Sequence, residues 1–337
     1  GSRAIAFTYR SISGVTGKPT AVSGAAFVPP GDAPAAGWPV IGYAHGTVGV
    51  TAECGPTGDP RLFGDIRAVS IQLEQGYAVV FTDYAGLGGG MKTADSGPHP
   101  YLEPKSAAFN LIDAVRAART AVPELSPRWV AMGSSQGGET AWAAAEYFSD
   151  YGEGTDLLGA AALVPTLDMS PLVQAAQDSS LTMDQLYLYP YVVTGLASVD
   201  PSINPDDYLH GALGENRTAL ISCGDESSSV KAELARDLAV AETKVSSPEA
   251  AERMTRLLTA YALPQQATDV PILAVYGGED DTVPPAWTEV AMGRACTLGD
   301  TVMRVRLETE GHTLDPGAIL GRWLTDRFAG APAAGNC

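Results

Sequence analysis

One serine in this sequence is surrounded by the residues that a catalytic nucleophile requires. An apolar run at residues 129–132 leads into Gly-Ser-Ser-Gln-Gly at residues 133–137, and an alanine-rich stretch of helical character follows. A serine on such a sharp strand-to-helix turn needs small residues two positions before and after it, because larger side chains would clash. The two glycines satisfy this for Ser135 and not for Ser134. We therefore expect Ser135 to be a nucleophile; the alternative is a plain Gly/Ser-rich turn.

An acid and a base follow in the chain order Ser, Asp, His that a hydrolase triad on an open α/β sheet would show. A buried-strand pattern at residues 270–276 ends in Gly-Gly-Glu-Asp-Asp-Thr-Val-Pro, at the edge where such sheets build their sites. The spacing Gly-x-x-Asp-x-x-Val-Pro selects Asp280, and we interpret Asp281 as a solvated loop residue or a turn former. His312 follows the next strand-like run. We expect His312 to take the proton of Ser135 while Asp280 holds the imidazole tautomer.

Two backbone N–H groups are predicted to stabilise the oxyanion of the tetrahedral intermediate. A His-Gly-Thr sequence follows a strand-like run, as an oxyanion loop would, and places Gly46 near the turn. Its N–H would join that of Gln136, each donor being worth on the order of 3 kcal/mol. We expect His45 to orient this loop; the alternative is a simple tight turn. Of the remaining histidines, His99 in a proline-rich turn is expected to be structural, and His210 in a polar loop is expected to lie at the surface.

No motif in the sequence calls for a cofactor or a metal ion. The cysteines and histidines lack the spacing of metal ligands, and no glycine pattern for a dinucleotide or a phosphate occurs with its usual partners. Asp83 also ends a strand-like run, but it precedes the serine, and turn-forming residues surround it. We therefore expect Asp83 to make structural hydrogen bonds.

Apolar strand-like runs alternate with helical patterns over most of the chain, which predicts a mostly parallel central sheet flanked by helices. Strands are expected at 4–9, 20–28, 40–45, 78–82, 129–133, 160–164, 272–276 and 302–307, and helices notably at 103–121, 139–148 and 285–296. The stretch of about a hundred residues between the strands that end at residue 164 and begin at residue 270 is too long for a simple crossover. It contains helix-like runs at 183–196, 230–240 and 248–262. We interpret it as a helical cap, residues 165–264, inserted between core segments 1–164 and 265–337.

Apolar and aromatic side chains gather in the first half of this cap: Met169, Leu172, Met183, Leu186, Tyr187, Tyr189 and Tyr191. Ordinary packing accounts for most of them. One or two are expected to line an acyl pocket, because the cap follows a strand whose carboxyl end faces the site. Leu186 and Tyr187 are our candidates for substrate binding.

The composition excludes several classes of partner. Lys+Arg 21 against Asp+Glu 39 gives a net charge of −18, which disfavours binding to nucleic acids and to anionic membranes. No run of about 18 apolar residues occurs, so no stable membrane insertion is expected. The four cysteines are an even number, typical of a secreted protein, and allow three disulfide connectivities. Free or buried thiols are the alternative.

The sequence resembles the secretory lipase family of α/β-hydrolases and its bacterial esterase relatives. The resemblance covers most of the chain and is carried by the motifs at 44–47 and 54–57, 82–88, 110–117, and 141–146 together with the serine turn. It implies an α/β-hydrolase fold and hydrolysis of carboxylic esters, with Ser135, Asp280 and His312 in the matching positions and a helical cap over the acyl site. It also implies disulfides that pair Cys54 with Cys223 and Cys296 with Cys337.

Three functions fit these observations. The first is a secreted carboxylesterase or lipase that acts on a small-molecule or lipid ester without a cofactor. The second, a serine peptidase or acyltransferase, would use the same residues, although peptidases of this fold usually add a large domain or an acidic site for the substrate amine. The third is a non-catalytic binding protein. Such a protein would have no physical reason to keep the triad and the oxyanion loop. We therefore predict a secreted serine esterase.

Overall fold

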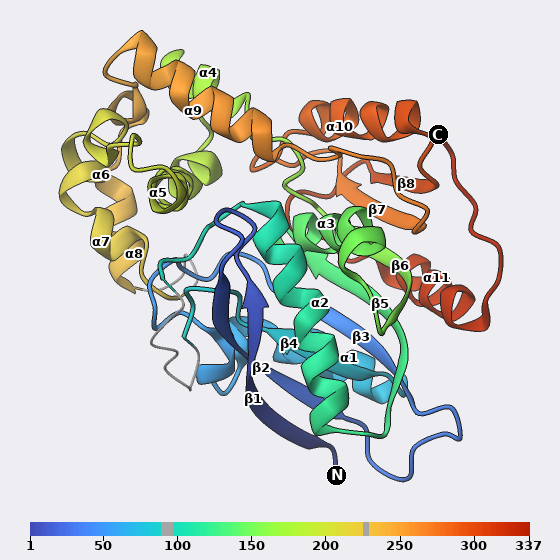
Figure 1. Ribbon diagram of the computed structural model, residues 1–337. Coiled ribbons are helices and arrows are strands. Elements are labelled where there is room, and N and C mark those ends of the chain that lie inside the picture. Colours follow the sequence, from blue (N-terminus) through green and yellow to red (C-terminus); the bar gives the residue numbers. More distant parts are fainter. Residues whose placement is uncertain (89–96, 225–228) are drawn as a thin grey trace.

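The computed structural model describes residues 1–88, 97–224 and 229–337. Within these residues, eight strands form one sheet in the order β1-β2-β4-β3-β5-β6-β7-β8 (Figure 1). They are β1 (Arg3–Ile12), β2 (Pro19–Val28), β3 (Trp38–Ala44), β4 (Ala78–Thr82), β5 (Leu125–Ser134), β6 (Asp156–Leu163), β7 (Ile272–Gly277) and β8 (Val302–Leu307). β1 and β2 pair antiparallel at one edge, and all other neighbours except β2 and β4 pair parallel. The predicted mostly parallel sheet is confirmed.

Helices cover both faces of the sheet. They are α1 (Ile66–Glu74), α2 (Pro104–Ala121), α3 (Gln136–Tyr151), α10 (Pro285–Leu298) and α11 (Gly317–Ala329). Alternate side chains of β3 enter different cores: Val40 packs in the cluster that includes α2, α3 and α10, whereas Ile41 packs in the cluster that includes α1 and α11. Every residue of β4 and β7 is buried, as expected for central strands covered on both faces.

Two strands begin four residues earlier than predicted, β5 at Leu125 rather than at residue 129 and β6 at Asp156 rather than at residue 160. The pairing of β5 with β3 shifts register between Trp38 and Val40. The sequence Ser-Pro-Arg at residues 126–128 resembles a turn. The register shift accommodates this proline near the start of the strand, where no helix or turn interrupts the pairing.

Six helices lie between β6 and β7 in the described part of the chain. They are α4 (Leu172–Gln177), α5 (Met183–Val199), α6 (Gly211–Glu215), α7 (Arg217–Leu220), α8 (Ser229–Leu234) and α9 (Pro248–Tyr261). Five 3-10 turns complete the described helical elements: η1 (Pro56–Gly58), η2 (Leu62–Gly64), η3 (Pro205–Asp207), η4 (Ala235–Asp237) and η5 (Val240–Thr243). The run predicted as one helix at 230–240 is divided: α8 ends at Leu234, η4 follows it, and the backbone is extended at Leu238.

The helices α4 to α9, which we call the cap helices, gather beyond one end of the sheet (Figure 1, upper left). Most members of one apolar cluster come from these helices, with Leu172, Leu186, Leu213 and Met254 fully buried in it, and a few core residues such as Val50 and Tyr101 join it. We propose on this basis the division into core segments 1–164 and 265–337 and a cap at 165–264. Across the described residues, no helix has the length and apolarity needed to cross a membrane.

The register of the parallel strands brings the loops of interest to one edge of the sheet. Ala44 at the end of β3 lies opposite Thr82 of β4 and Gly133 of β5. Gly277 at the end of β7 lies opposite Leu307 of β8. Because parallel strands point the same way, the segments that follow them begin side by side.

Candidate active site

Ser135 stands at a sharp bend between β5 and α3. Its backbone has φ 57° and ψ −119°, a conformation that side chains rarely adopt and that persists only when neighbouring structure holds it. A Cβ atom on either Gly133 or Gly137 would collide with the carbonyl oxygen of Ala44, so only glycine fits both positions. The N–H of Ser135 donates to the carbonyl oxygen of Leu163 at 2.9 Å. The bend therefore has the geometry that the Gly-x-Ser-x-Gly pattern predicts.

The imidazole of His312 lies between a hydroxyl and a carboxylate. Its Nε2 is 2.8 Å from Oγ of Ser135, and its Nδ1 is 2.8 Å from Oδ2 of Asp280. A carboxylate can only accept, so Nδ1–H donates to Asp280 and Nε2 is left to accept the proton of the serine hydroxyl. The Asp280 side chain is 2% exposed and that of His312 is 20% exposed. The structure thus brings together the three residues predicted as nucleophile, acid and base.

Asp280 is also held by the backbone. Its Oδ1 accepts hydrogen bonds from the N–H groups of Thr282, at 2.9 Å, and of Val283, at 2.8 Å. Asp281 is exposed, and its backbone carbonyl accepts from Thr182 of the cap at 2.7 Å. Of the two adjacent acids, the one selected by spacing is the one that faces His312.

Gly46 and Gln136 both lie next to the nucleophile. A Cβ atom on Gly46 would stand 3.3 Å from the carbonyl oxygen of Ser134 and 3.9 Å from Cβ of Ser135, so the loop after β3 passes directly over the bend. Gln136 is the first residue of α3, where backbone N–H groups lack acceptors within the helix and the helix dipole favours negative charge. This arrangement suits the stabilisation of an oxyanion.

His45 fixes the loop that carries Gly46. It is fully buried, its ring lies 4.3 Å from the ring of Tyr84, and its backbone carbonyl accepts from the Tyr84 hydroxyl at 3.0 Å. Burial lowers the pKa of His45, so the neutral ring is favoured. Its Nδ1 is 2.6 Å from the carbonyl oxygen of Gly46. His45 therefore orients the loop, as the sequence suggested.

His99 makes structural hydrogen bonds, but its contact with Gln136 was not predicted from the sequence. Its Nε2 lies 2.9 Å from the side-chain amide nitrogen of Gln136, and its Nδ1 lies 2.8 Å from the carbonyl oxygen of Ala85. Burial lowers the pKa of His99 to about 4, so the ring is neutral at physiological pH. Nδ1–H then donates to Ala85 and Nε2 accepts from Gln136. No spacing rule links residue 99 to residue 136, so the sequence held no signal for this contact.

Asp83 makes structural hydrogen bonds, as predicted. Its carboxylate accepts from Oγ of Ser23 at 2.6 Å and from the N–H of Thr57 at 2.8 Å, and the Thr57 hydroxyl also donates to it. It joins β2 and η1 to the end of β4. His210 lies at the surface of the cap, with Nε2 3.0 Å from the carbonyl oxygen of Lys244.

A cavity of about 490 Å³ opens in front of Ser135, and we call it the Ser135 cavity. Core residues line one side of it, including Gly46 and His312, and the cap lines the other. The contribution of α5 is Asp184, Tyr187, Leu188 and Tyr191, whose spacing of three and four residues defines one face of the helix. Tyr187 is thus on the wall. Leu186 is not: it points to the other side of α5 and is fully buried among the cap helices.

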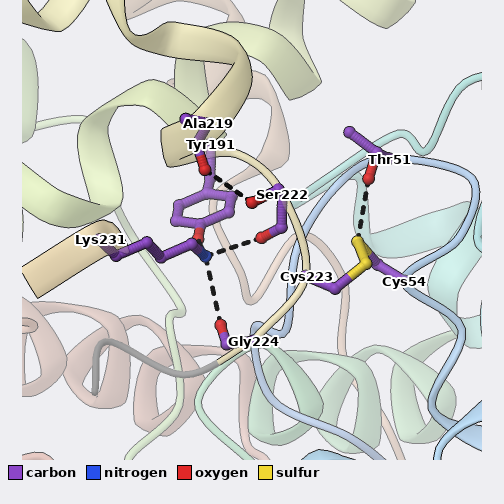
Figure 2. Close-up of a disulfide and its surroundings, with 8 residues drawn as sticks. All are labelled: Thr51, Cys54, Tyr191, Ala219, Ser222, Cys223, Gly224 and Lys231. Atoms are coloured by element: carbon purple, nitrogen blue, oxygen red, sulfur yellow. Dashed lines mark hydrogen bonds between the residues drawn. A yellow bond between two sulfur atoms is a disulfide. The ribbon is translucent and has the colours of Figure 1, made fainter. Parts of the chain in front are cut away.

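A disulfide ties the cap to the loop that follows β3 (Figure 2). It joins Cys54 to Cys223, and two backbone hydrogen bonds flank it, from Val50 N–H to Ile221 O at 3.1 Å and from Gly224 N–H to Val48 O at 3.0 Å. The second disulfide joins Cys296 at the end of α10 to Cys337. Both pairings are those that the family resemblance implies.

Lys231 of α8 reinforces this connection from the cap side (Figure 2). Its Nζ donates to the carbonyl oxygens of Ser222, at 2.7 Å, and Gly224, at 3.2 Å, and to the hydroxyl of Tyr191, at 2.6 Å. Lys231 and Tyr191 both line the Ser135 cavity. The segment around Cys223 is therefore held both to the core loop and to α5.

The chain is similar in structure to several hydrolases. The rice cell wall degrading esterase LipA from Xanthomonas oryzae is 23% identical with a TM-score of 0.73, over 97% of this chain and 88% of that one. A putative hydrolase from Legionella pneumophila is 18% identical with a TM-score of 0.75, over the same shares. Candida antarctica lipase A in its closed state is 14% identical with a TM-score of 0.75, over 99% of this chain and 79% of that one. These likenesses establish the α/β-hydrolase fold.

The sequence itself identifies the family. A search of curated proteins finds no significant match. The family model described as secretory lipase, however, matches residues 64–336, which is most of the chain and includes Ser135, Asp280 and His312. The chain belongs to the secretory lipase family and is, as a member of it, a carboxylic ester hydrolase.

Proposed function

We propose that the protein hydrolyses esters through an acyl-enzyme intermediate on Ser135. The observation that carries the proposal is the position of His312, whose two ring nitrogens lie 2.8 Å from Ser135 Oγ and 2.8 Å from Asp280 Oδ2. The serine projects from a strained bend into a cavity large enough for a substrate. A nucleophile, a base and a group that orients the base are the parts that acyl transfer needs.

The reaction proceeds in two steps. His312 Nε2 takes the proton of Ser135 as Oγ attacks the ester carbonyl, and Asp280 stabilises the imidazolium. The N–H groups of Gly46 and Gln136 donate to the oxyanion of the tetrahedral intermediate. Collapse breaks the bond to the alcohol, which receives the proton from His312. Water, activated by the same imidazole, then attacks the acyl-enzyme and releases the acid.

We further propose that the enzyme is secreted and acts on small-molecule or lipid esters. The family and the two disulfides support an extracellular location, because disulfides persist in oxidising compartments. The cavity faces the cap, and Tyr187 on its wall supports a role for this residue in substrate binding. The acyl-enzyme is common to peptidases and acyltransferases, so an ester and the matching amide are compared in the test below.

The test is hydrolysis of p-nitrophenyl acetate and p-nitroacetanilide, together with labelling by a fluorophosphonate. We expect ester hydrolysis, little amide hydrolysis and a single adduct on Ser135. Ser135→Ala should lower kcat/KM by on the order of 10⁴-fold or more and abolish labelling. Ser149→Ala, at the exposed end of α3, is the matched control and should behave as wild type. Retained activity in Ser135→Ala, or an adduct elsewhere, would contradict the proposal.

A further inference from the structure

The core holds the first half of the loop that follows β7. The N–H of Glu279 donates to the carbonyl oxygen of Glu310 at 2.9 Å, one residue before Asp280. Residues 281–283, which follow Asp280, are called here the acid turn. Within the described chain, the hydrogen bonds that the acid turn makes outside its own loop all go to the cap. The position of this turn therefore depends on the cap.

The start of α5 makes these hydrogen bonds. The hydroxyl of Thr182, the residue that precedes the helix, donates to the carbonyl oxygen of Asp281 at 2.7 Å. Nε2 of Gln185 donates to the carbonyl oxygen of Thr282 at 3.3 Å. The Thr282 hydroxyl in turn donates to Oδ2 of Asp184 at 3.3 Å. Three polar side chains at one end of a cap helix thus contact the acid turn.

Thr182 and Gln185 also form the capping box of α5. Oγ1 of Thr182 accepts from the N–H of Gln185 at 3.1 Å, and Oε1 of Gln185 accepts from the N–H of Thr182 at 3.1 Å. Gln185 is 2% exposed. Each side chain therefore uses its acceptor for the helix and its donor for the acid turn. With both ends of the two side chains engaged, the acid turn has little freedom to move relative to α5.

The apolar residue of the acid turn also packs against the cap. Val283 is 2% exposed and belongs to the apolar cluster that the cap helices mostly form. The N–H groups of Val283 and Thr282 are the two that donate to Oδ1 of Asp280. Both donors that fix the carboxylate are thus carried by residues that the cap holds, one through hydrogen bonds and the other through apolar packing.

We propose that Thr182 and Gln185 are positioning residues that hold Asp280, through the acid turn, in the orientation that His312 requires. This inference rests on the proposed function and gives the cap a second role in it. A cap that only lined the Ser135 cavity would affect the esters that reach its wall and leave the smallest esters unchanged. A cap that positions the acid affects the hydrolysis of p-nitrophenyl acetate as well.

Gln185→Met tests the proposal, because it keeps the length and neutrality of the side chain and removes its donor to the acid turn. Gln185 does not line the Ser135 cavity as described, so KM for p-nitrophenyl acetate should change by less than about twofold. We expect kcat to fall by about tenfold, since both steps of the reaction use the imidazole that Asp280 orients. The acidic limb of the pH profile of kcat/KM should move to lower pH by about half a unit, because a loosened carboxylate stabilises the imidazolium less.

Thr182→Val tests the same link independently, including the case in which Gln185→Met does not fold. It removes the hydroxyl and should reproduce the loss of kcat and the displaced limb, whereas Thr182→Ser keeps the hydroxyl and should restore both. None of these variants changes a charge. The other ionisable side chains that line the cavity with His312 are left as they are: Asp184, Tyr187, Tyr191 and Lys231.

The matched control is Ser247→Ala. The hydroxyl of Ser247 caps α9 by accepting from the N–H of Ala250 at 3.2 Å, and among the described residues it makes no contact with the acid turn. Its loss should lower the melting temperature, as in Thr182→Val, without changing kcat or the pH profile.

Wild-type kcat and an unmoved acidic limb in Gln185→Met and Thr182→Val would overturn the proposal. An equal loss of kcat in Ser247→Ala would also overturn it, because loosening of the cap in general would then account for the rate. Failure of the proposed function is distinct from both results, since Ser135→Ala would then match wild type on p-nitrophenyl acetate.

Discussion

The orientation of the His312 imidazole depends on a carboxylate with little freedom. Both Asp280 oxygens are engaged, one by His312 and the other by the N–H groups of Thr282 and Val283. A carboxylate fixed in this way permits a single imidazole tautomer, the one whose Nε2 can accept a proton. The catalytic state of the base is thus set by a turn in the loop after β7.

Asp280→Asn is expected to lower kcat by on the order of 10⁴-fold, because an amide can turn its N–H₂ toward His312 and stabilise the wrong tautomer. Asp281→Asn is the control at the adjacent position and should change kcat by less than about threefold, since Asp281 contributes only its backbone carbonyl to the contact with Thr182. Steady-state kinetics on p-nitrophenyl acetate decide between them. A larger loss in Asp281→Asn would show that the acid has been misassigned.

Stability at acidic pH is expected to depend on His99. Burial lowers its pKa from 6.5 to about 4, so between these values the unfolded chain binds a proton that the folded protein excludes. The folded state therefore loses stability as pH falls from 6.5 to 4, by about 3 kcal/mol in total. The free energy of unfolding, measured with urea between pH 4 and 6.5, should depend less steeply on pH in His99→Gln than in wild type. His210→Gln is the surface control. An identical slope in wild type and His99→Gln would contradict the assignment.

The role of a residue could be predicted from the sequence where a short motif around it has a stereochemical reason. Ser135 needs its two glycines, and Asp280 follows a buried strand at a fixed spacing before Val-Pro, so the sequence around each carries the information. The contact between His99 and Gln136 depends on how the loop before α2 passes over α3. No periodicity or motif encodes that path.

At the level of elements, the rotation of α5 about its own axis, which we call its phase, decides which of its side chains face the Ser135 cavity. The sequence marked residues 186 and 187 as equivalent candidates, but neighbours on a helix point about 100° apart. Only Tyr187 shares a face with Asp184, Leu188 and Tyr191 on the cavity wall. The phase follows from packing of the cap helices against each other, which the local sequence does not reveal because α5 is apolar on nearly all sides.

Leu186→Ala and Tyr187→Ala should therefore affect different properties, the first stability and the second ester preference. Leu186→Ala creates a cavity among the cap helices and should lower the free energy of unfolding by about 2–5 kcal/mol, with little change in the relative kcat/KM of different esters. Tyr187→Ala should change that preference while costing less stability. Urea unfolding and a panel of p-nitrophenyl esters of rising acyl length check both. A shift of preference in Leu186→Ala alone would contradict the phase of α5.

The return from the cap to the sheet is fixed by a side chain of α3. Glu146 accepts hydrogen bonds from Trp142 Nε1, at 2.8 Å, and from the N–H of Gln265, at 3.0 Å. The carbonyl oxygen of Glu146 accepts in addition from the Gln266 side chain at 2.7 Å. The helix that begins at the nucleophile thus anchors the segment where the cap helices end. The cap is attached at this point and, through Cys223, at the loop that follows β3.

On the scale of the whole molecule, the two disulfides join different parts of the protein. Cys54–Cys223 spans 169 residues and joins the cap to the loop after β3, whereas Cys296–Cys337 spans 41 residues and joins α10 to the segment that follows α11. In the chain-entropy model the longer loop contributes about 5 kcal/mol and the shorter about 4 kcal/mol. Their contributions to stability are similar, but their positions relative to Ser135 are not.

Replacing both members of each pair by serine should separate these roles. Both double variants should melt several degrees lower, because similar loop-closure entropy is restored to the unfolded chain. Only the Cys54→Ser/Cys223→Ser variant should also lose kcat on p-nitrophenyl acetate, since the segment tied by this disulfide continues directly into the loop that carries Gly46. Calorimetry and kinetics at a temperature where both variants are folded give the comparison. An equal loss of kcat in the Cys296→Ser/Cys337→Ser variant would mean that loosening anywhere, and not the position of the oxyanion loop, controls the rate.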